Sequence, residues 1–151
     1  MRYFEDFSLG ETFEFGSYHV TEEEIIAFAS KYDPQSFHID PVQAKASLFG
    51  DLVASGWHTA SISMRLLVDG LFGQTAAKAS PGIKDLRWLE PVRADDVLKL
   101  RFTIIEARVS QSRPRIGILQ SRNELINQDG VTVMSMIASH FIGRRPETAS
   151  A

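Results

Sequence analysis

The chain has 151 residues, a length typical of one domain that can bury a substantial core. Apolar residues make up 44% of the chain and charged residues 23%, and a formal net charge of −3 offers no overall attraction to nucleic acid. Disulfides and thiol chemistry are excluded because there is no cysteine. The acidic amino terminus is unlike a secretory signal, and no run approaches the roughly 20 apolar residues of a membrane span. We therefore expect a cytoplasmic protein with neither a nucleic-acid nor a membrane partner.

The amino-terminal third predicts one strand and two helices. Residues 11–20 carry alternating phenylalanines and favour a strand. Thr21 and Glu24 have the spacing of a capping box, which predicts a helix that ends at Asp33-Pro34 because a proline disfavours helical backbone at the residue before it. Asp40-Pro41 indicates a second, short helix that runs to near Gly50, with Asp40 as its N-cap.

A long helix is predicted over residues 55–72. Apolar residues lie on most of its circumference, a pattern typical of a helix that is enclosed by protein rather than lying on a surface. Its length would be about 27 Å at 1.5 Å per residue. Ser55-Gly56 stands at its amino end.

The rest of the chain predicts β-structure. Apolar and polar residues alternate, most clearly over residues 98–104, and an Asp-Gly pair indicates a tight hairpin turn. The strand-like runs are 86–88, 98–104, 115–126 and 131–142. This order predicts an α+β domain over residues 1–143, in which an antiparallel sheet curls around the long helix, and a disordered tail over 144–151. Open sheet edges favour pairing with a second copy, so we expect a homodimer or a higher homo-oligomer.

Asp33 and His38 form the first candidate site. Five positions separate them, a spacing that suits neither one face of a helix nor one face of a strand. The two side chains can converge only if the backbone bends between them, and Pro34 favours such a bend. A converging pair of this kind could act as general acid and base. The alternative is a surface Asp-Pro turn with an incidental histidine.

The other polar residues are weaker candidates for a functional site than Asp33 and His38. No second histidine stands at ligand spacing from His38, so we expect no metal site. His58 could line a pocket or serve as a buried structural histidine, and Ser61 could line a pocket or bond back to its own helix. Five arginines are candidates for phosphate contacts, although solvated hairpin charges explain them as well: Arg108, Arg113, Arg115, Arg144 and Arg145.

These motifs together resemble the MaoC-like dehydratases, a family that includes (R)-specific enoyl-CoA hydratases and has the hot-dog fold. The family motif runs Asp-x-Asn-Pro-x-His-x-Asp, followed by an alanine, a phenylalanine and a His-Gly pair that opens the central helix. The positions here that correspond to it are Asp33, His38, Asp40, Ala44, Phe49 and Ser55-Gly56, with Ser61 further along the helix. The similarity continues through residues 89–96 and 127–130 and so covers nearly the whole domain.

Three residues depart from the family motif. Gln35 replaces its asparagine, Ser36 its proline and Ser55 its histidine. The spacing between Asp33 and His38 is unchanged. The departures therefore concern the geometry of the loop and the entrance of the pocket.

The resemblance implies an enoyl-thioester hydratase that also runs in reverse, as a 3-hydroxyacyl-thioester dehydratase. Asp33 and His38 would hold the water and move its protons, which gives syn addition. The amino end of the central helix at Ser55 and Gly56 would form the oxyanion hole, with Trp57 and Ser61 at the substrate. The substrate would be a thioester of coenzyme A or of an acyl carrier protein, and no cofactor is implied.

Two other functions remain open. A hot-dog thioesterase would release free thiol from saturated acyl-CoA, although the paired Asp33 and His38 argue against it. A non-catalytic acyl-thioester-binding domain is the other, which the departures from the motif leave open. The acyl group is not defined by the sequence, but Phe37 and Trp57 favour a narrow pocket for short or unusual chains.

Overall fold

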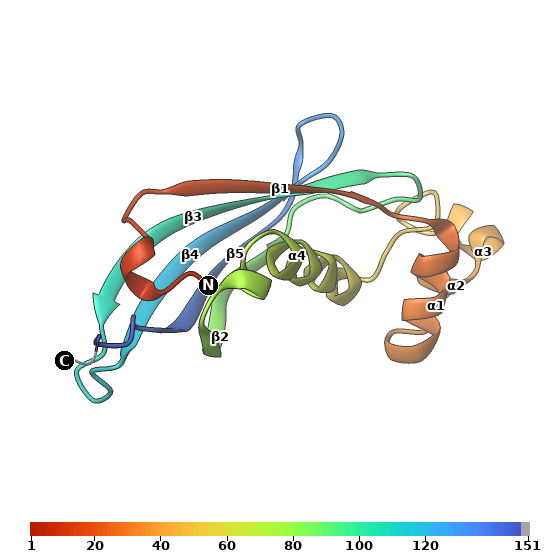
Figure 1. Cartoon of the computed structure of the whole chain (residues 1–151). Coiled ribbons are helices and arrows are strands. Elements are labelled where there is room, and N and C mark those ends of the chain that lie inside the picture. The colour runs from red at the N-terminus through yellow and green to blue at the C-terminus, as the bar shows by residue number, and fades with distance from the viewer. Residues whose placement is uncertain (149–151) are drawn as a thin grey trace.

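A curved five-stranded sheet wraps around one long helix (Figure 1) in the computed structural model, which describes residues 1–148. The strands are β1 (Thr12–His19), β2 (Ala77–Trp88), β3 (Val97–Val109), β4 (Ile116–Ile126) and β5 (Thr132–Gly143). Their order across the sheet is β1-β3-β4-β5-β2, and each neighbouring pair is antiparallel. The prediction of an antiparallel sheet around a central helix is confirmed, and β1 and β2 are its two edges.

The central helix, α4 (Gly56–Gly70), is followed by the 3-10 turn η2 (Phe72–Gln74). The side of α4 that faces the sheet supplies Ile62, Leu66 and Leu67 to the core. The helix is not enclosed on most sides, contrary to the sequence prediction, because Trp57, Met64 and Val68 are exposed in the single chain. An apolar strip of α4 therefore remains uncovered by the chain's own sheet.

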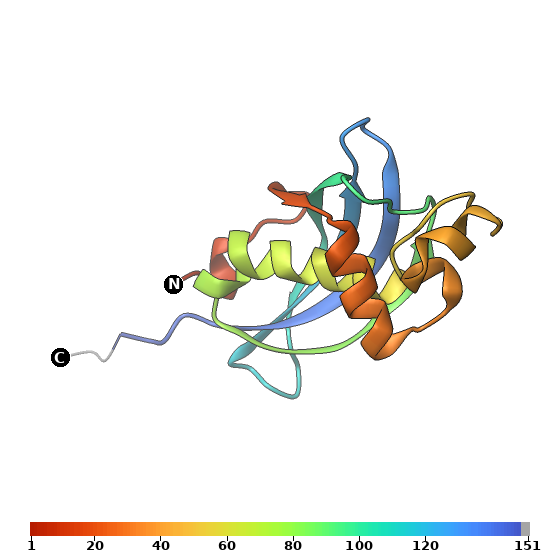
Figure 2. The ribbon, with the colours of Figure 1, turned by 90° about the vertical axis from the view of Figure 1, so that its right-hand side faces the viewer.

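Three short helices gather at one end of the molecule, α1 (Glu22–Tyr32), α2 (Ser36–Ile39) and α3 (Pro41–Lys45) (Figures 1 and 2). Thr21 caps α1 as predicted, since its hydroxyl accepts from the Glu24 N–H at 3.1 Å. The Glu24 carboxylate does not complete the capping box and instead accepts a hydrogen bond from the Tyr18 hydroxyl. Asp40 caps α3 through the first backbone N–H groups of that helix, which ends five residues before Gly50.

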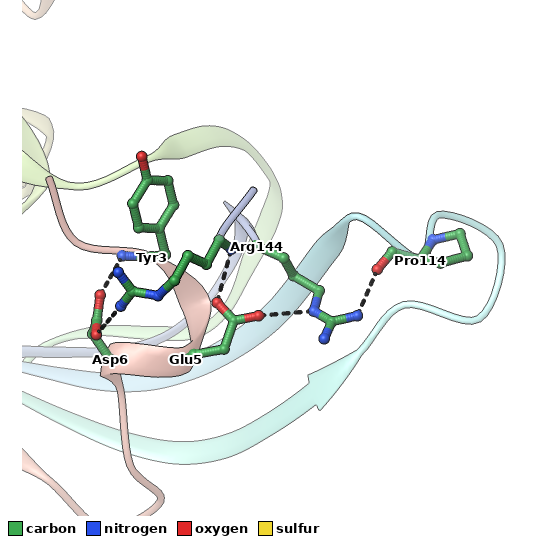
Figure 3. Close-up of polar contacts among 6 residues, drawn as sticks. Tyr3, Glu5, Asp6, Pro114 and Arg144 are labelled. Carbon is green, nitrogen blue, oxygen red and sulfur yellow. Dashed lines mark hydrogen bonds and ion pairs between the residues drawn. The ribbon is translucent and has the colours of Figure 1, made fainter. Parts of the chain in front are cut away.

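Residues close to the two termini contact each other away from α1–α3, at the other end of the sheet (Figure 1). Figure 3 shows Arg144 donating to Glu5 of the 3-10 turn η1 (Phe4–Asp6) and to the Pro114 carbonyl in the β3–β4 loop. The Arg145 guanidinium pairs with Asp6. Arg144 and Arg145 are thus bound to the fold rather than part of a disordered tail, whereas residues 149–151 lie outside the described residues. Within residues 1–148, no helix has the length and apolar character needed to cross a membrane.

Candidate active site

The bend between Asp33 and His38 brings their side chains together. Asp33 ends α1, Pro34 turns the chain, and His38 belongs to the single turn of α2. The His38 Nε2 atom lies 3.2 Å from Asp33 Oδ2. His38 is buried at 5% exposure, so this is not a surface turn with an incidental histidine.

Two hydrogen bonds hold the Asp33 carboxylate. Gln35 Nε2 donates to Oδ1 and Ser55 Oγ donates to Oδ2, each at 2.7 Å. Partial burial alone would raise the pKa of Asp33, but these two donors and the nearby His38 outweigh it and hold the pKa below its usual value. Asp33 is therefore ionised throughout the neutral pH range.

The His38 ring is oriented by a backbone carbonyl. Its Nδ1 lies 2.6 Å from the oxygen of Val53, which can only accept a hydrogen bond, so Nδ1 carries the proton. In the neutral imidazole the lone pair is then on Nε2, the atom that faces Asp33. The fold thus places the Nε2 atom of an oriented imidazole beside a fixed carboxylate.

A cavity of about 390 Å³ opens beside this pair. His38 lines it together with Gly56 and Thr59 of α4 and with residues 88–91, at the end of β2 and just beyond it. The first backbone bond of α4 runs from the Thr59 N–H to the Ser55 carbonyl, so the N–H groups before it lack acceptors within the helix. The positive end of the helix dipole therefore points toward the cavity where Gly56 lines it.

The Trp88 side chain leaves room only for a glycine at position 56. The Trp88 Nε1 donates to the Gly56 carbonyl at 2.9 Å, and a Cβ at position 56 would come within 2.4 Å of the indole ring. The indole of Trp57 meets that of Trp88 edge to face. Trp57 itself is 58% exposed and is not among the residues that line the cavity.

Ser61 does not join the predicted site. Its hydroxyl donates to the Trp57 carbonyl at 2.8 Å, and its side chain lines another cavity beside Tyr18 and His58. Of the six predicted residues, the structure brings four together: Asp33, His38, Ser55 and Gly56. The sequence spacing placed Ser61 on the helix correctly but could not define which face meets the cavity.

His58 belongs to a structural contact between α1 and α4. It is buried, stacks on Phe28, and has Nε2 3.2 Å from Glu24 Oε1 in an orientation that does not make a hydrogen bond. Burial and the neighbouring Glu24 raise the pKa of Tyr18 to about 12. Among residues 1–148, no three acidic or histidine side chains are grouped so that they could hold a metal ion.

Three of the arginines considered for phosphate binding serve other contacts. Three of the five pair with nearby acids: Arg108 with Glu106, Arg144 with Glu5, and Arg145 with Asp6. The pairs of Arg144 and Arg145 join the segment after β5 to η1 (Figure 3). Solvated, locally paired charges are therefore the better explanation for these three.

Sequence reasoning missed three parts of the site. Gln35 was identified only as a departure from the family motif, although an amide two residues from Asp33 is a natural donor to it. The Val53 carbonyl carries no sequence signal, because any residue supplies one. Trp88 was assigned to a strand, and nothing in its spacing connects it with Gly56.

Comparison with known proteins identifies the family. The model of the MaoC-like domain matches residues 6–123. The chain belongs to the MaoC-like domain family. It is 32% identical to the uncharacterized protein YdeM of Bacillus subtilis over 93% of this chain and 98% of that protein.

Solved structures agree with the hot-dog fold predicted for this MaoC-like protein. The MaoC-like dehydratase of Rhodospirillum rubrum superposes with a TM-score of 0.88 at 39% identity, covering 95% of this chain and 98% of that one. The (R)-hydratase PhaJ1 of Pseudomonas aeruginosa has a TM-score of 0.79 at 20% identity, covering 99% and 92%. The second likeness concerns the fold alone.

Proposed function

We propose that this MaoC-like protein is a cytoplasmic enoyl-thioester hydratase, which also works in reverse as a 3-hydroxyacyl-thioester dehydratase. One observation carries the proposal: the Nε2 atom of His38 lies 3.2 Å from the fixed Asp33 carboxylate, at the cavity beside the amino end of α4. The 39% identity to a protein described as a MaoC-like dehydratase supports the reaction class.

His38 moves the proton, and Asp33 supports this transfer electrostatically. His38 Nε2 takes a proton from water as the water oxygen bonds to C3 of the enoyl group, and the resulting imidazolium returns that proton to C2. The Asp33 carboxylate orients the water and stabilises the imidazolium. Its lowered pKa suits this role, because it remains charged while His38 changes its protonation state. Water and proton reach the same face of the double bond, so the addition is syn.

The amino end of α4 supplies the third requirement. Negative charge develops on the thioester oxygen when C3 is attacked, and the N–H of Gly56 or its neighbour can donate to that oxygen. Glycine at this position lets the substrate approach the backbone closely. Removal of one oxyanion donor commonly lowers the rate about 10² to 10³-fold.

The substrate is a thioester of coenzyme A or an acyl carrier protein, and the reaction uses no cofactor. The assay that tests the proposal follows loss of enoyl absorbance with a short trans-2-enoyl-CoA, together with free thiol. Loss of absorbance without thiol release is expected. Thiol release from saturated acyl-CoA would indicate a thioesterase instead, and binding without turnover would indicate a non-catalytic domain.

A further inference from the structure

A second cavity of about 330 Å³ lies further along α4. Gly56 and Thr59 line the cavity beside His38, whereas Ser63 and Leu67 line the second one. Residues three or four apart share one face of a helix, so a single face of α4 forms a wall of both cavities. Ser63 is seven residues beyond Gly56, or about 10 Å along the helix axis.

Buried polar side chains form part of the wall of this second cavity. Ser121 Oγ lies 2.7 Å from Asn123 Oδ1 and 2.8 Å from His140 Nε2, and all three residues are buried. A serine hydroxyl has one proton, so it donates to Asn123 and accepts from the protonated Nε2 of His140. Asn123 and His140 both line the cavity. The amide nitrogen of Asn123 takes no part in these two hydrogen bonds.

Ser63 is the unsatisfied member of the second cavity. It is fully buried, and among residues 1–148 its hydroxyl has no hydrogen-bond partner. A buried hydroxyl without a partner destabilises a fold, so a ligand that supplies the bond would stabilise this one. A ligand with a polar group would therefore satisfy this hydroxyl inside an otherwise largely apolar cavity.

The cavity favours a neutral ligand group. Its one charged lining residue, Lys78, is exposed on the edge strand β2. Burial lowers the pKa of His140 to about 4, so the imidazole is neutral at pH 7. A charged group would lose its hydration here without gaining a buried partner of opposite charge.

We propose that the acyl group of the substrate carries a neutral hydrogen-bonding group, a hydroxyl or a carbonyl, that enters the second cavity and bonds with Ser63 and Asn123. This inference rests on the proposed function, because it assigns the distal part of the same thioester substrate. The thioester then lies at Gly56, and the polar group lies about two helical turns beyond it.

The test compares trans-2-enoyl-CoA substrates of six, eight and ten carbons that end in a hydroxyl with plain-chain substrates of the same heavy-atom number. We expect kcat/KM to favour the hydroxyl at one or more lengths by about tenfold, the effect of one net hydrogen bond. Ser63→Ala should reduce this ratio about tenfold. Ser61→Ala, on another face of α4, should leave the ratio unchanged. A structural role of Ser63 would lower both rates equally and preserve the ratio.

The inference is overturned if no length shows a preference, or if Ser63→Ala leaves the preference intact. Failure of the proposed function gives a different result, because no enoyl-CoA would then be turned over. In that case calorimetric titration with the saturated hydroxyacyl-CoA and acyl-CoA series measures the same ratio as affinities. A preference that depends on Ser63 would support the cavity assignment, and equal affinities would refute it.

Discussion

At the scale of single residues, two of the departures from the family motif act on the same carboxylate. Gln35 and Ser55, two of the three departures, are the two side chains that donate to the Asp33 carboxylate. Ser55 was expected at the oxyanion hole, but its hydroxyl is committed to Asp33 and does not cap α4. The substitutions therefore provide a different support for the same carboxylate, which argues against a loss of function at these positions.

Ser55→Ala tests this support. Loss of a hydrogen bond to a charged group should raise the pKa of Asp33 toward its usual value and lower kcat for enoyl-CoA hydration about tenfold or more. Ser61→Ala is the matched control, because Ser61 bonds to the Trp57 carbonyl and lies away from the cavity. Equal activity of the two variants would show that Ser55 does not support the site.

His140 predicts a pH dependence of stability. Above pH 6.5 its imidazole is neutral in the folded and unfolded states, but below pH 6.5 the unfolded chain binds the proton first, because burial lowers the folded-state pKa to about 4. The free energy of unfolding should thus fall by about 2 kcal/mol from this residue between pH 6.5 and 5. Urea unfolding of His140→Gln should show a correspondingly weaker pH dependence, and an unchanged one would contradict the assignment.

At the scale of elements, long periodic segments were predicted better than short or edge ones. The helix α4 and the strands β4 and β5 follow clear apolar patterns, and their predicted ranges agree with the structure within two residues. The run predicted over residues 98–104 falls within β3, which continues five residues further. The turn α2 has four residues, too few to show a helical period. Most of β2 was missed because it is an exposed edge strand whose first residues are small or polar, without alternation.

Prediction of the candidate site from sequence succeeded only where the signal was local. The convergence of Asp33 and His38 followed from a proline bend, a local signal in the sequence. The meeting of Ser55 with Asp33 joins elements 22 residues apart, and that of Trp88 with Gly56 joins elements 32 residues apart. Such contacts depend on how the elements pack, which spacing along the chain does not define.

Gly56→Ala tests the packing at the amino end of α4. The added Cβ would meet the Trp88 ring at 2.4 Å, so the ring must move and its hydrogen bond to the Gly56 carbonyl is lost. We expect a loss of about 1 to 3 kcal/mol in the free energy of unfolding by urea. In a Trp88→Ala background the same substitution should cost much less, since the clash is absent. An equal cost in both backgrounds would contradict this contact.

At the scale of the whole molecule, one side of the chain lacks a cover. The edge strand β2 is exposed along nearly its whole length, and the uncovered strip of α4 adds apolar surface. Unpaired strand edges and apolar patches favour association. We therefore propose a homodimer formed through β2, in agreement with the expectation from sequence.

Light scattering coupled to size-exclusion chromatography should give the mass of two chains. Ile83→Glu places a charge on an exposed apolar position of β2 and should shift the protein to the mass of one chain. Val131→Glu, a similarly exposed apolar position in the β4–β5 turn, should remain dimeric. A monomeric wild-type protein would refute the proposed dimer.

The hydration of a short trans-2-enoyl-CoA by the wild-type protein, Asp33→Asn and His38→Gln tests the proposed chemistry most directly. Proton transfer by His38 contributes about 10² to 10⁴ in rate, and Asp33 stabilises the imidazolium that this transfer forms. Both variants should therefore lose at least 10²-fold in kcat while their urea midpoints stay close to that of the wild type. His19→Gln is the matched control, since His19 pairs with Asp95 at 2.9 Å on the surface, and it should keep full activity. Wild-type turnover that survives both Asp33→Asn and His38→Gln would contradict the assignment of this pair.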